Sequence, residues 1–292
     1  MTTNDQPDMT TDHFIYVFCA FPGFLSPEKC CFFNEMIQEQ FARRAVEILK
    51  TDNAVTGLAA AGSWISNELD EFSDLDLILV TKEKISADKT KMLAYARRLG
   101  DLLTGFTGEH VGEPRVLICL FDNPLLHVDI KFVTLKEFED RIETPVILLD
   151  KEGQLENTLS RSTPKFPYPE YQWIEDRFWT WVHYALVKIG RGEYFEALDF
   201  FSALRSMVLG PLLHIKNGNL PKAVRKIESQ VTREDLDQLL RTLPAYDKIS
   251  LINALEQTIS LYRDLRRSLF TKEVILQTRA EEKVMQYLDE IK

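Results

Sequence analysis

Cysteine and histidine are scarce in this chain, and neither is arranged as a set of metal ligands. The 292 residues contain four cysteines and five histidines. No two cysteines form a Cys-x-x-Cys pair, and no histidine cluster accompanies them. These absences argue against a structural zinc site and against a framework of disulfides. A reducing compartment, the cytoplasm, is therefore the expected location.

The chain also lacks an excess of positive charge. Lysine and arginine number 35 against 45 aspartates and glutamates, so the formal net charge is −10. Proteins that bind nucleic acid usually carry a basic surface that neutralises phosphates, and the sequence has no long Lys/Arg-rich tract. An acidic field instead attracts cationic partners. We therefore expect a small cationic ligand rather than a nucleic acid.

The apolar segment near the N-terminus is too short to cross a membrane. Residues 14–25 have about half the length that a membrane helix requires, and Pro22 and Gly23 interrupt them. Acidic residues precede this segment, whereas a secretory signal begins with basic ones. We interpret residues 1–35 as an irregular extension; alternatively, translation begins at Met36, near the start of a helical pattern. No membrane partner is expected.

The length of the chain predicts two domains, because 292 residues exceed the usual size of a single hydrophobic core. Residues 36–156 carry both strand and helix patterns and are expected to form an α+β domain, a mixed sheet with flanking helices. Residues 157–170 are rich in Ser, Thr and Pro and show no helical period, which predicts a linker. Residues 171–292 are expected to form a C-terminal helical bundle.

The periodicity of apolar residues predicts the individual elements. Strands are expected at residues 55–61, 74–80, 115–121, 126–133 and 145–149. Helices are expected at residues 34–50, 86–103, 171–190, 194–216, 232–242, 247–270 and 272–291. Thr134 and Glu137 form a Thr-x-x-Glu capping box, which predicts that a further short helix begins there.

A Gly-Ser step followed by two aspartates is the first candidate for chemistry. Gly62 and Ser63 follow one predicted strand, and Asp74 and Asp76 begin the next. Alternate residues of a strand point to one face, so both carboxylates reach one site, and Mg²⁺ prefers carboxylate and phosphate oxygens. Glycine lets the backbone approach a phosphate closely, and Ser63 opens a turn or short helix where its hydroxyl and backbone N–H groups face an anion. The segment predicts an anion site beside a cation site.

Asp129 lies in the middle of an otherwise apolar strand, residues 126–133. A carboxylate in such a place is costly without compensation, and three carboxylates together repel one another unless cations neutralise them. If this strand pairs beside that of Asp74 and Asp76, the three side chains form a site for two metal ions. Each feature also has a structural alternative: a turn capped by Ser63, a solvated edge strand, or an exposed strand position.

The segment GSWISNELDEFSDLDLILV resembles the signature of the polymerase-β-like nucleotidyltransferase superfamily. The shared features are Gly-Ser, a spacer, Asp-x-Asp at a strand start and a third Asp on a later strand, and they cover about residues 34–135. The layout, a catalytic domain followed by a helical bundle, is similar to that of small bacterial nucleotidyltransferases that modify aminoglycosides and lincosamides.

This resemblance implies roles for the candidate residues. Mg²⁺ would be held by Asp74 and Asp76, and the triphosphate by Gly62 and Ser63. Asp129 would bind metal, act as the base on the acceptor hydroxyl, or do both. Two residues are alternative bases, namely Glu109 and Glu113.

A cation is also needed to balance the phosphates. Lys188 shares one stripe of the helix at 171–190 with Arg177, Trp181 and Tyr184. We expect Lys188 to bind the triphosphate. The alternative is that the aromatic residues of this stripe belong to the core and its cations are solvated.

The sequence therefore predicts transfer of a nucleoside monophosphate, AMP from ATP or the equivalent from another nucleoside triphosphate, to a hydroxyl of a small cationic molecule such as an aminoglycoside, with release of pyrophosphate. One alternative is a nucleotidyltransferase that acts on nucleic-acid ends, which the acidic charge disfavours. The other is a non-catalytic regulatory or antitoxin-like protein that keeps the fold, which the presence of all three carboxylates disfavours.

Overall fold

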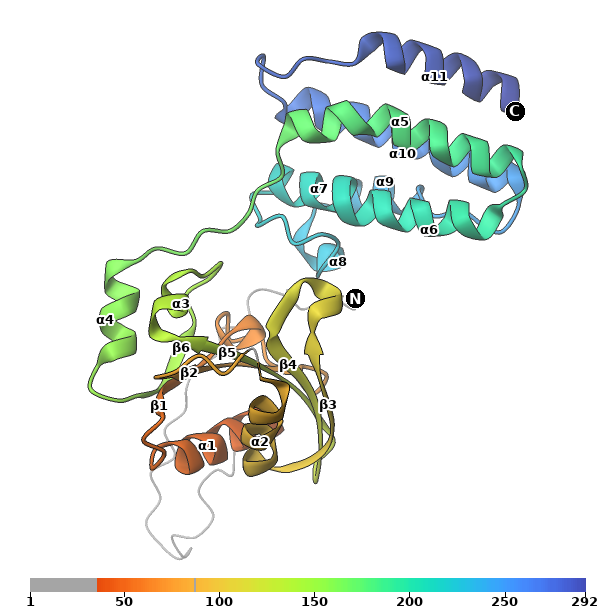
Figure 1. Cartoon of the computed structure of the whole chain (residues 1–292). Coiled ribbons are helices and arrows are strands. Elements are labelled where there is room, and N and C mark those ends of the chain that lie inside the picture. Colours follow the sequence, from red (N-terminus) through yellow and green to blue (C-terminus); the bar gives the residue numbers. More distant parts are fainter. Residues whose placement is uncertain (1–35, 87) are drawn as a thin grey trace, which may run out of the picture.

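A computed structural model describes residues 36–86 and 88–292 and shows a six-stranded mixed sheet with flanking helices, followed by a helical bundle (Figure 1). The predicted α+β fold class is confirmed. The expectation for residues 1–35 lies outside the described residues. The strands are β1 (Val55–Ala60), β2 (Leu75–Thr81), β3 (Asp101–Gly108), β4 (Glu113–Asp122), β5 (Leu126–Thr134) and β6 (Val146–Asp150).

The helices divide between the sheet region and the bundle. Those of the sheet region are α1 (Ile37–Leu49), α2 (Lys89–Leu99), α3 (Leu135–Glu139), α4 (Gln154–Arg161) and the 3-10 turns η1 (Gly62–Trp64) and η2 (Glu109–Val111). Those of the bundle are α5 (Tyr171–Gly190), α6 (Tyr194–Leu204), the π-helix η3 (Arg205–Leu209), α7 (Gly210–Lys216), α8 (Ile227–Gln230), α9 (Arg233–Leu240), α10 (Lys248–Leu269) and α11 (Thr278–Ile291).

The strand order β3-β4-β5-β2-β1-β6 places the two aspartate-bearing strands side by side. β2 and β5 pair in parallel, whereas the four other pairings are antiparallel. A parallel pair requires a crossover connection, and here α2, β3 and β4 provide it. In this register Asp76 lies directly opposite Asp129. The pairing that the three-carboxylate hypothesis requires is present.

Strict alternation along β2 separates the two faces of the sheet. Leu75, Leu77 and Leu79 are at most 1% exposed and pack in one core with residues of α1 and α2. Each such leucine contributes roughly 2 kcal/mol by leaving water. The opposite face carries Asp76 and Asp129, and α3 and α4 cover only the part of it near Val80 and Val133. In Figure 1 the sheet lies between α1 and α2 on one side and the bundle on the other.

The predicted capping box at Thr134 is confirmed. The Thr134 hydroxyl accepts a hydrogen bond from Glu137 N at 3.3 Å, and the Glu137 carboxylate accepts one from Thr134 N at 2.9 Å. These contacts satisfy two N–H groups that a helix start leaves without partners. The chain therefore turns into α3 directly after β5, the strand that carries Asp129.

The expected helix at residues 86–103 is wrong at its C-terminal end. The helix ends at Leu99, Gly100 has an extended backbone, and β3 begins at Asp101. β3 is one of the two edge strands of the sheet and pairs with β4 along its length. Leu102 and Leu103 continue the helical period of the sequence, but pairing with β4 overrides this local preference.

A second correction concerns the segment expected to have no helical period, residues 157–170. Its first five residues belong to α4, which packs on α3 and β1. The Asp150 carboxylate accepts hydrogen bonds from Leu155 N at 3.0 Å and Glu156 N at 2.9 Å, so it caps the helix from the end of β6. Residues 162–170 have no regular secondary structure and lead to α5.

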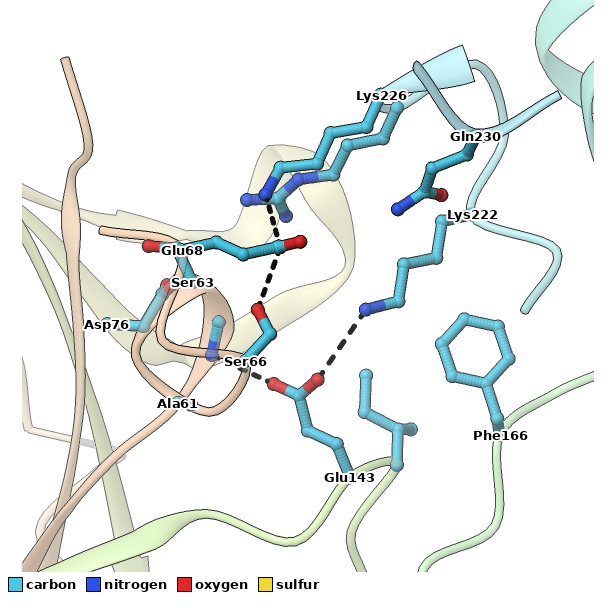
Figure 2. A pocket seen from close by; sticks show the side chains of 13 residues that line it. Ala61, Ser63, Ser66, Glu68, Asp76, Glu143, Phe166, Lys222, Lys226 and Gln230 are labelled. Carbon is cyan, nitrogen blue, oxygen red and sulfur yellow. Dashed lines mark hydrogen bonds and ion pairs between the residues drawn. The ribbon is translucent and has the colours of Figure 1, made fainter. Parts of the chain in front are cut away.

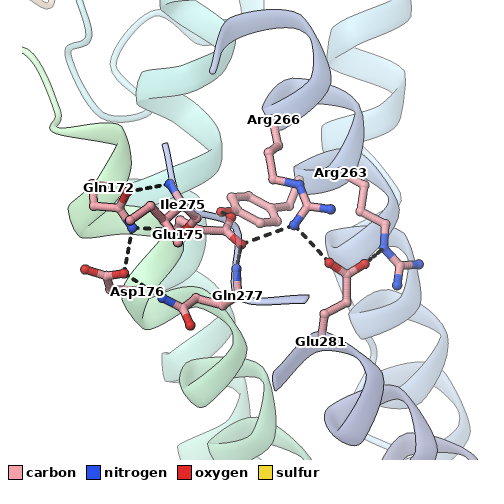
Figure 3. Close-up of polar contacts among 9 residues, drawn as sticks. Gln172, Glu175, Asp176, Arg263, Arg266, Ile275, Gln277 and Glu281 are labelled. Atoms are coloured by element: carbon pink, nitrogen blue, oxygen red, sulfur yellow. Dashed lines mark hydrogen bonds and ion pairs between the residues drawn. The ribbon is translucent and has the colours of Figure 1, made fainter. Parts of the chain in front are cut away.

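The bundle is held by an apolar core that includes stacked aromatic rings and by the buried carboxylate of Glu175. Phe178 and Tyr262 stack at 3.5 Å between ring centroids. Glu175 is fully buried and accepts hydrogen bonds from the Tyr262 hydroxyl at 2.5 Å, Arg266 Nη1 at 3.2 Å and Gln277 N at 2.9 Å (Figure 3). These contacts join α5 to α10 and to the segment before α11. That segment contains a turn at residues 272–274 and no helix, so the helix expected at residues 272–291 begins only at Thr278.

One helical stretch within the described part of the chain, Tyr194–Lys216, is long and apolar enough to cross a membrane by length and composition alone. Half of its apolar window is buried inside the bundle. The apolar composition of this stretch therefore matches its place as a core helix of the bundle.

Candidate active site

The turn after β1 brings the backbone of Gly62 against the Asp76 carboxylate. Gly62 has φ +60°, in the left-handed region, and a Cβ atom there would lie 2.0 Å from Asp76 Oδ2. Ala61 N donates to Asp76 O at 3.0 Å and continues the β1–β2 pairing up to the turn. Glycine is therefore required at position 62 both by the backbone conformation and by the close approach of the carboxylate.

The three predicted aspartates influence one another electrostatically. Burial, together with the charges of Asp74 and Asp129, raises the pKa of Asp76 to about 6, while Arg225 opposes this shift. Burial also raises the pKa of Asp129, whereas its hydrogen bond to His127 Nε2, at 3.0 Å from Asp129 Oδ1, lowers it. The cluster thus carries a repulsion that a bound cation would relieve.

The donor chemistry at this place fits Mg²⁺, which prefers carboxylate oxygens. Asp76 and Asp129 lie opposite one another on neighbouring strands, and Asp74 is close enough to raise the pKa of both. Within residues 36–86 and 88–292, no three Asp, Glu, His or Cys side chains are gathered around one point as they stand. Metal binding would therefore draw these carboxylates together.

A cavity of about 460 Å³ opens beside Asp76, between the sheet and the bundle. Gly62 and Ser63 line it from the turn after β1, and Lys222 and Lys226 line it from the loop between α7 and α8 (Figure 2). Arg225 belongs to the same wall. The cavity thus combines backbone N–H groups, a hydroxyl and three cationic side chains next to Asp76, and these are groups that can bind a polyphosphate.

The basic loop, residues 222–226, owes its position to the helix behind it. Gly210 lies directly after the π-helix η3, and a Cβ atom there would come within 2.3 Å of Ala223 O. Ala223 and Lys226 both have positive φ, 52° and 55°. Non-glycine residues in that region are strained, and π-helical turns and strain are often found at functional sites.

Two ion pairs bridge the sheet region and this loop. Lys226 Nζ lies 2.8 Å from Glu68 Oε2, and Lys222 Nζ lies 3.7 Å from Glu143 Oε2. Glu143 also accepts a hydrogen bond from Gly62 N at 3.0 Å. The two sides of the cavity are therefore in direct contact.

Comparison with known proteins decides the family. The family model described as streptomycin adenylyltransferase matches residues 36–291. The chain belongs to the streptomycin adenylyltransferase family. It is therefore a nucleotidyltransferase that uses a nucleoside triphosphate, and the non-catalytic alternative is set aside.

Two solved structures of bacterial proteins are similar to this chain. The first, an aminoglycoside 6-adenyltransferase from Bacillus subtilis, is 15% identical, with 87% of this chain and 98% of that chain covered and a TM-score of 0.36. The second, a nucleotidyltransferase-like protein from Exiguobacterium sibiricum, is 12% identical, with 87% and 89% covered and a TM-score of 0.36. No curated protein matches the chain.

Of the predicted site residues, Gly62, Ser63 and Asp76 line the cavity. Asp129 faces Asp76 across the β2–β5 pair. Asp74 lines a second hollow of about 400 Å³, to which His127, the partner of Asp129, also contributes. Asp76 therefore lines the cavity and Asp74 lines the second hollow, which also reaches Ile37 at the start of α1.

The predicted triphosphate ligand Lys188 lies outside the cavity. It lies in the last turn of α5, pairs with Glu193 at 2.6 Å and Glu196 at 2.8 Å, and does not line the cavity. The cations of the cavity wall come instead from residues 222–226, which sequence reasoning missed. The signal for them is the run KAVRK, but three charges in five residues are unremarkable until the fold shows that this loop faces the sheet.

The alternative bases differ from Asp129 in their proton affinity. The hydrogen bond from Arg115 lowers the pKa of Glu113 to about 2, and Lys131 lies 2.9 Å from the same carboxylate. The Thr107 hydroxyl lowers the pKa of Glu109. A base needs appreciable affinity for the proton it takes. Burial instead raises the pKa of Asp129, which stays a candidate base.

Proposed function

We propose that the enzyme transfers AMP from ATP to a hydroxyl of a cationic, aminoglycoside-type antibiotic and releases pyrophosphate. The observation that carries this proposal is the cavity in which a basic wall and the Gly62 turn meet Asp76, which lies opposite Asp129 in the β2–β5 register. The family of the chain supports adenylyl transfer, and its description names streptomycin, a molecule of the proposed class.

The basic half of the cavity is suited to the triphosphate. A nucleoside triphosphate carries roughly four negative charges, which Lys222, Arg225 and Lys226 can offset from one side. The Ser63 hydroxyl and the Gly62 N–H face the same space from the other. Phe166, which also lines the cavity, offers an aromatic surface for the nucleotide base.

Asp74, Asp76 and Asp129 are the residues that would hold Mg²⁺. When bound, the ion would supply charge neutralisation at the phosphate oxygens. The Asp129 carboxylate accepts the proton of the acceptor hydroxyl as the hydroxyl oxygen bonds to the α-phosphorus, and the bond from that phosphorus to the pyrophosphate oxygen breaks. His127 orients Asp129 through its contact with Oδ1.

The hollow beside Asp74 is the proposed acceptor site. Glu71 and Asp74 provide negative charge there, and Phe72 and Leu125, which are 87% and 64% exposed, provide apolar surface. Such a surface suits a cationic molecule with sugar-like rings, because carboxylates pair with its amines and apolar groups pack on ring faces. The net charge of −10 attracts the same class of acceptor.

The test is a pyrophosphate-release screen with the purified full chain, Mg²⁺ and each nucleoside triphosphate in turn. Streptomycin and other aminoglycosides form the cationic set, and a lincosamide, a neutral sugar and a short RNA serve as comparison acceptors. The expected result is ATP-dependent release with a cationic acceptor, whose product gains the mass of one AMP. Release only with RNA, or only with a neutral acceptor, would reject the proposal.

A further inference from the structure

Glu143 occupies a place that the triphosphate would need. This residue lies in the connection between α3 and β6, and its side chain is 25% exposed. One carboxylate oxygen accepts the hydrogen bond from Gly62 N at 3.0 Å, and the other lies 3.7 Å from Lys222 Nζ (Figure 2). A single anionic group therefore spans the turn after β1 and the basic loop.

A carboxylate held between a backbone N–H and a lysine uses the same interactions as a phosphate oxygen. The Gly62 N–H has one proton to donate, so it cannot bind Glu143 and a phosphate fully at the same time. In the cavity as it stands, the three cations Lys222, Arg225 and Lys226 are matched by three carboxylates. A triphosphate would bring about four further negative charges into this balance.

We propose that Glu143 is an internal competitor of the triphosphate, which holds the Gly62–Lys222 phosphate subsite until the nucleotide displaces it. This inference rests on the proposed function. It assigns Glu143 a part in ligand selection: a ligand with several phosphates provides enough contacts to displace the carboxylate, whereas a single phosphate does not. After transfer, the return of Glu143 to Gly62 N–H helps to expel pyrophosphate.

The chain offers a matched control in Glu68. Glu68 also lines the cavity and also forms an ion pair across it, with Lys226 at 2.8 Å, but it makes no hydrogen bond to Gly62 N. Glu143→Gln and Glu68→Gln each remove one negative charge and one ion pair between the sheet region and the loop. Only the first changes the group that occupies the phosphate subsite.

The experiment measures dissociation constants by calorimetry with Mg²⁺ and α,β-methylene-ATP, which cannot transfer AMP, and with inorganic phosphate. Glu143→Gln should bind the ATP analogue about tenfold more tightly than the wild type, equivalent to about 1.4 kcal/mol, and should gain measurable binding of inorganic phosphate. Glu68→Gln should show a smaller change and no gain for phosphate. In turnover assays, the KM for ATP should fall in Glu143→Gln.

Several outcomes would overturn the proposal: equal affinity of wild type and Glu143→Gln, weaker binding by the variant, or equal effects of the two variants. Glu143→Ala, which removes the acceptor altogether, is the second variant if Glu143→Gln melts below the assay temperature. A wild-type enzyme that turns over ATP while neither Glu143 variant binds the analogue more tightly rejects the Glu143 role and leaves the proposed function intact. Failure of every protein to bind a nucleoside triphosphate rejects both.

Discussion

At the scale of single residues, Gly62 is needed because the Asp76 carboxylate occupies the space that a side chain at position 62 would fill. Gly62→Ala should lower kcat/KM about a hundredfold, since a displacement of about 1 Å at a reacting group costs that much. The left-handed backbone should add a stability cost of about 1 kcal/mol. Steady-state kinetics and thermal unfolding measure the two effects.

Gly153 is the matched control for this prediction. It also has positive φ, +66°, but nothing lies within 4 Å of its would-be Cβ atom. Gly153→Ala should therefore show a similar loss of stability with little loss of activity. If both variants lose activity equally, the close approach of Gly62 to Asp76 is not the reason that glycine is needed for activity at position 62.

Asp76 should show opposite effects on activity and on stability. Asp76→Asn should abolish Mg²⁺-dependent turnover and the stabilisation by Mg-ATP. In metal-free buffer at neutral pH the same variant should be more stable than the wild type. The reason is the pKa of Asp76, which burial and neighbouring carboxylates raise from 3.8 to about 6 in the folded state. Ionising this carboxyl therefore costs free energy of folding.

The sign of this effect determines its pH dependence. The cost of ionising Asp76 grows as pH rises from 3.8 through about 6 and is complete above that value. There the free energy of unfolding of Asp76→Asn should exceed that of the wild type by on the order of 3 kcal/mol or less. Below about pH 4 the two proteins should be equally stable. Urea unfolding at several pH values measures the difference. Asp289→Asn, at a solvated position of α11, is the control and should change stability by less than about 0.5 kcal/mol.

At the scale of elements, the π-helix η3 and Gly210 set the position of the basic loop. Gly210→Ala would place a Cβ atom 2.3 Å from Ala223 O, so the loop must shift. We expect the KM for ATP to rise about tenfold, because each displaced charged contact is worth roughly 1.5 kcal/mol or more. Gly190→Ala is the control, since its Cβ atom would meet only Ile291 Cδ1 at 3.5 Å. An unchanged KM in Gly210→Ala would contradict this role.

The loop between α7 and α8 and the end of α5 offer competing cations. Lys222→Met and Arg225→Met should each raise the KM for ATP about tenfold, because both residues line the cavity. Lys188→Met should leave that KM unchanged, because Lys188 pairs with Glu193 and Glu196 instead. If only Lys188→Met raised the KM for ATP, the result would support the sequence-based assignment of Lys188 to the triphosphate. The measurement is initial rate against ATP concentration at saturating acceptor.

At the scale of the whole molecule, the acidic charge should steer a cationic acceptor to the site. With a net charge of −10, kcat/KM for an aminoglycoside should fall several-fold as salt rises from low to physiological concentration, where the Debye length is about 8 Å. The same measurement with a neutral acceptor is the control and should show little dependence on salt. Turnover of cationic acceptors that does not respond to salt would contradict steering.

Local patterns in the sequence were sufficient for much of the fold and for the core of the site. The alternation in β2 and β5 depends only on the period of a strand, and the Thr134 capping box depends on residues three apart. Gly62, Ser63, Asp74 and Asp76 lie within fifteen residues of one another, so their spacing alone suggested a site. These are features whose physical cause is short in range.

Only the tertiary structure decided what depends on contacts between distant segments. The parallel register that sets Asp76 opposite Asp129 follows from pairing across an intervening helix and two strands. β3 is a strand because β4 is beside it, although its first residues continue a helical period. The contact of Gly62 with Glu143 spans 81 residues, and that of Lys226 with Glu68 spans 158. The cations of the cavity belong to this second class, because no local period records which bundle loop faces the sheet.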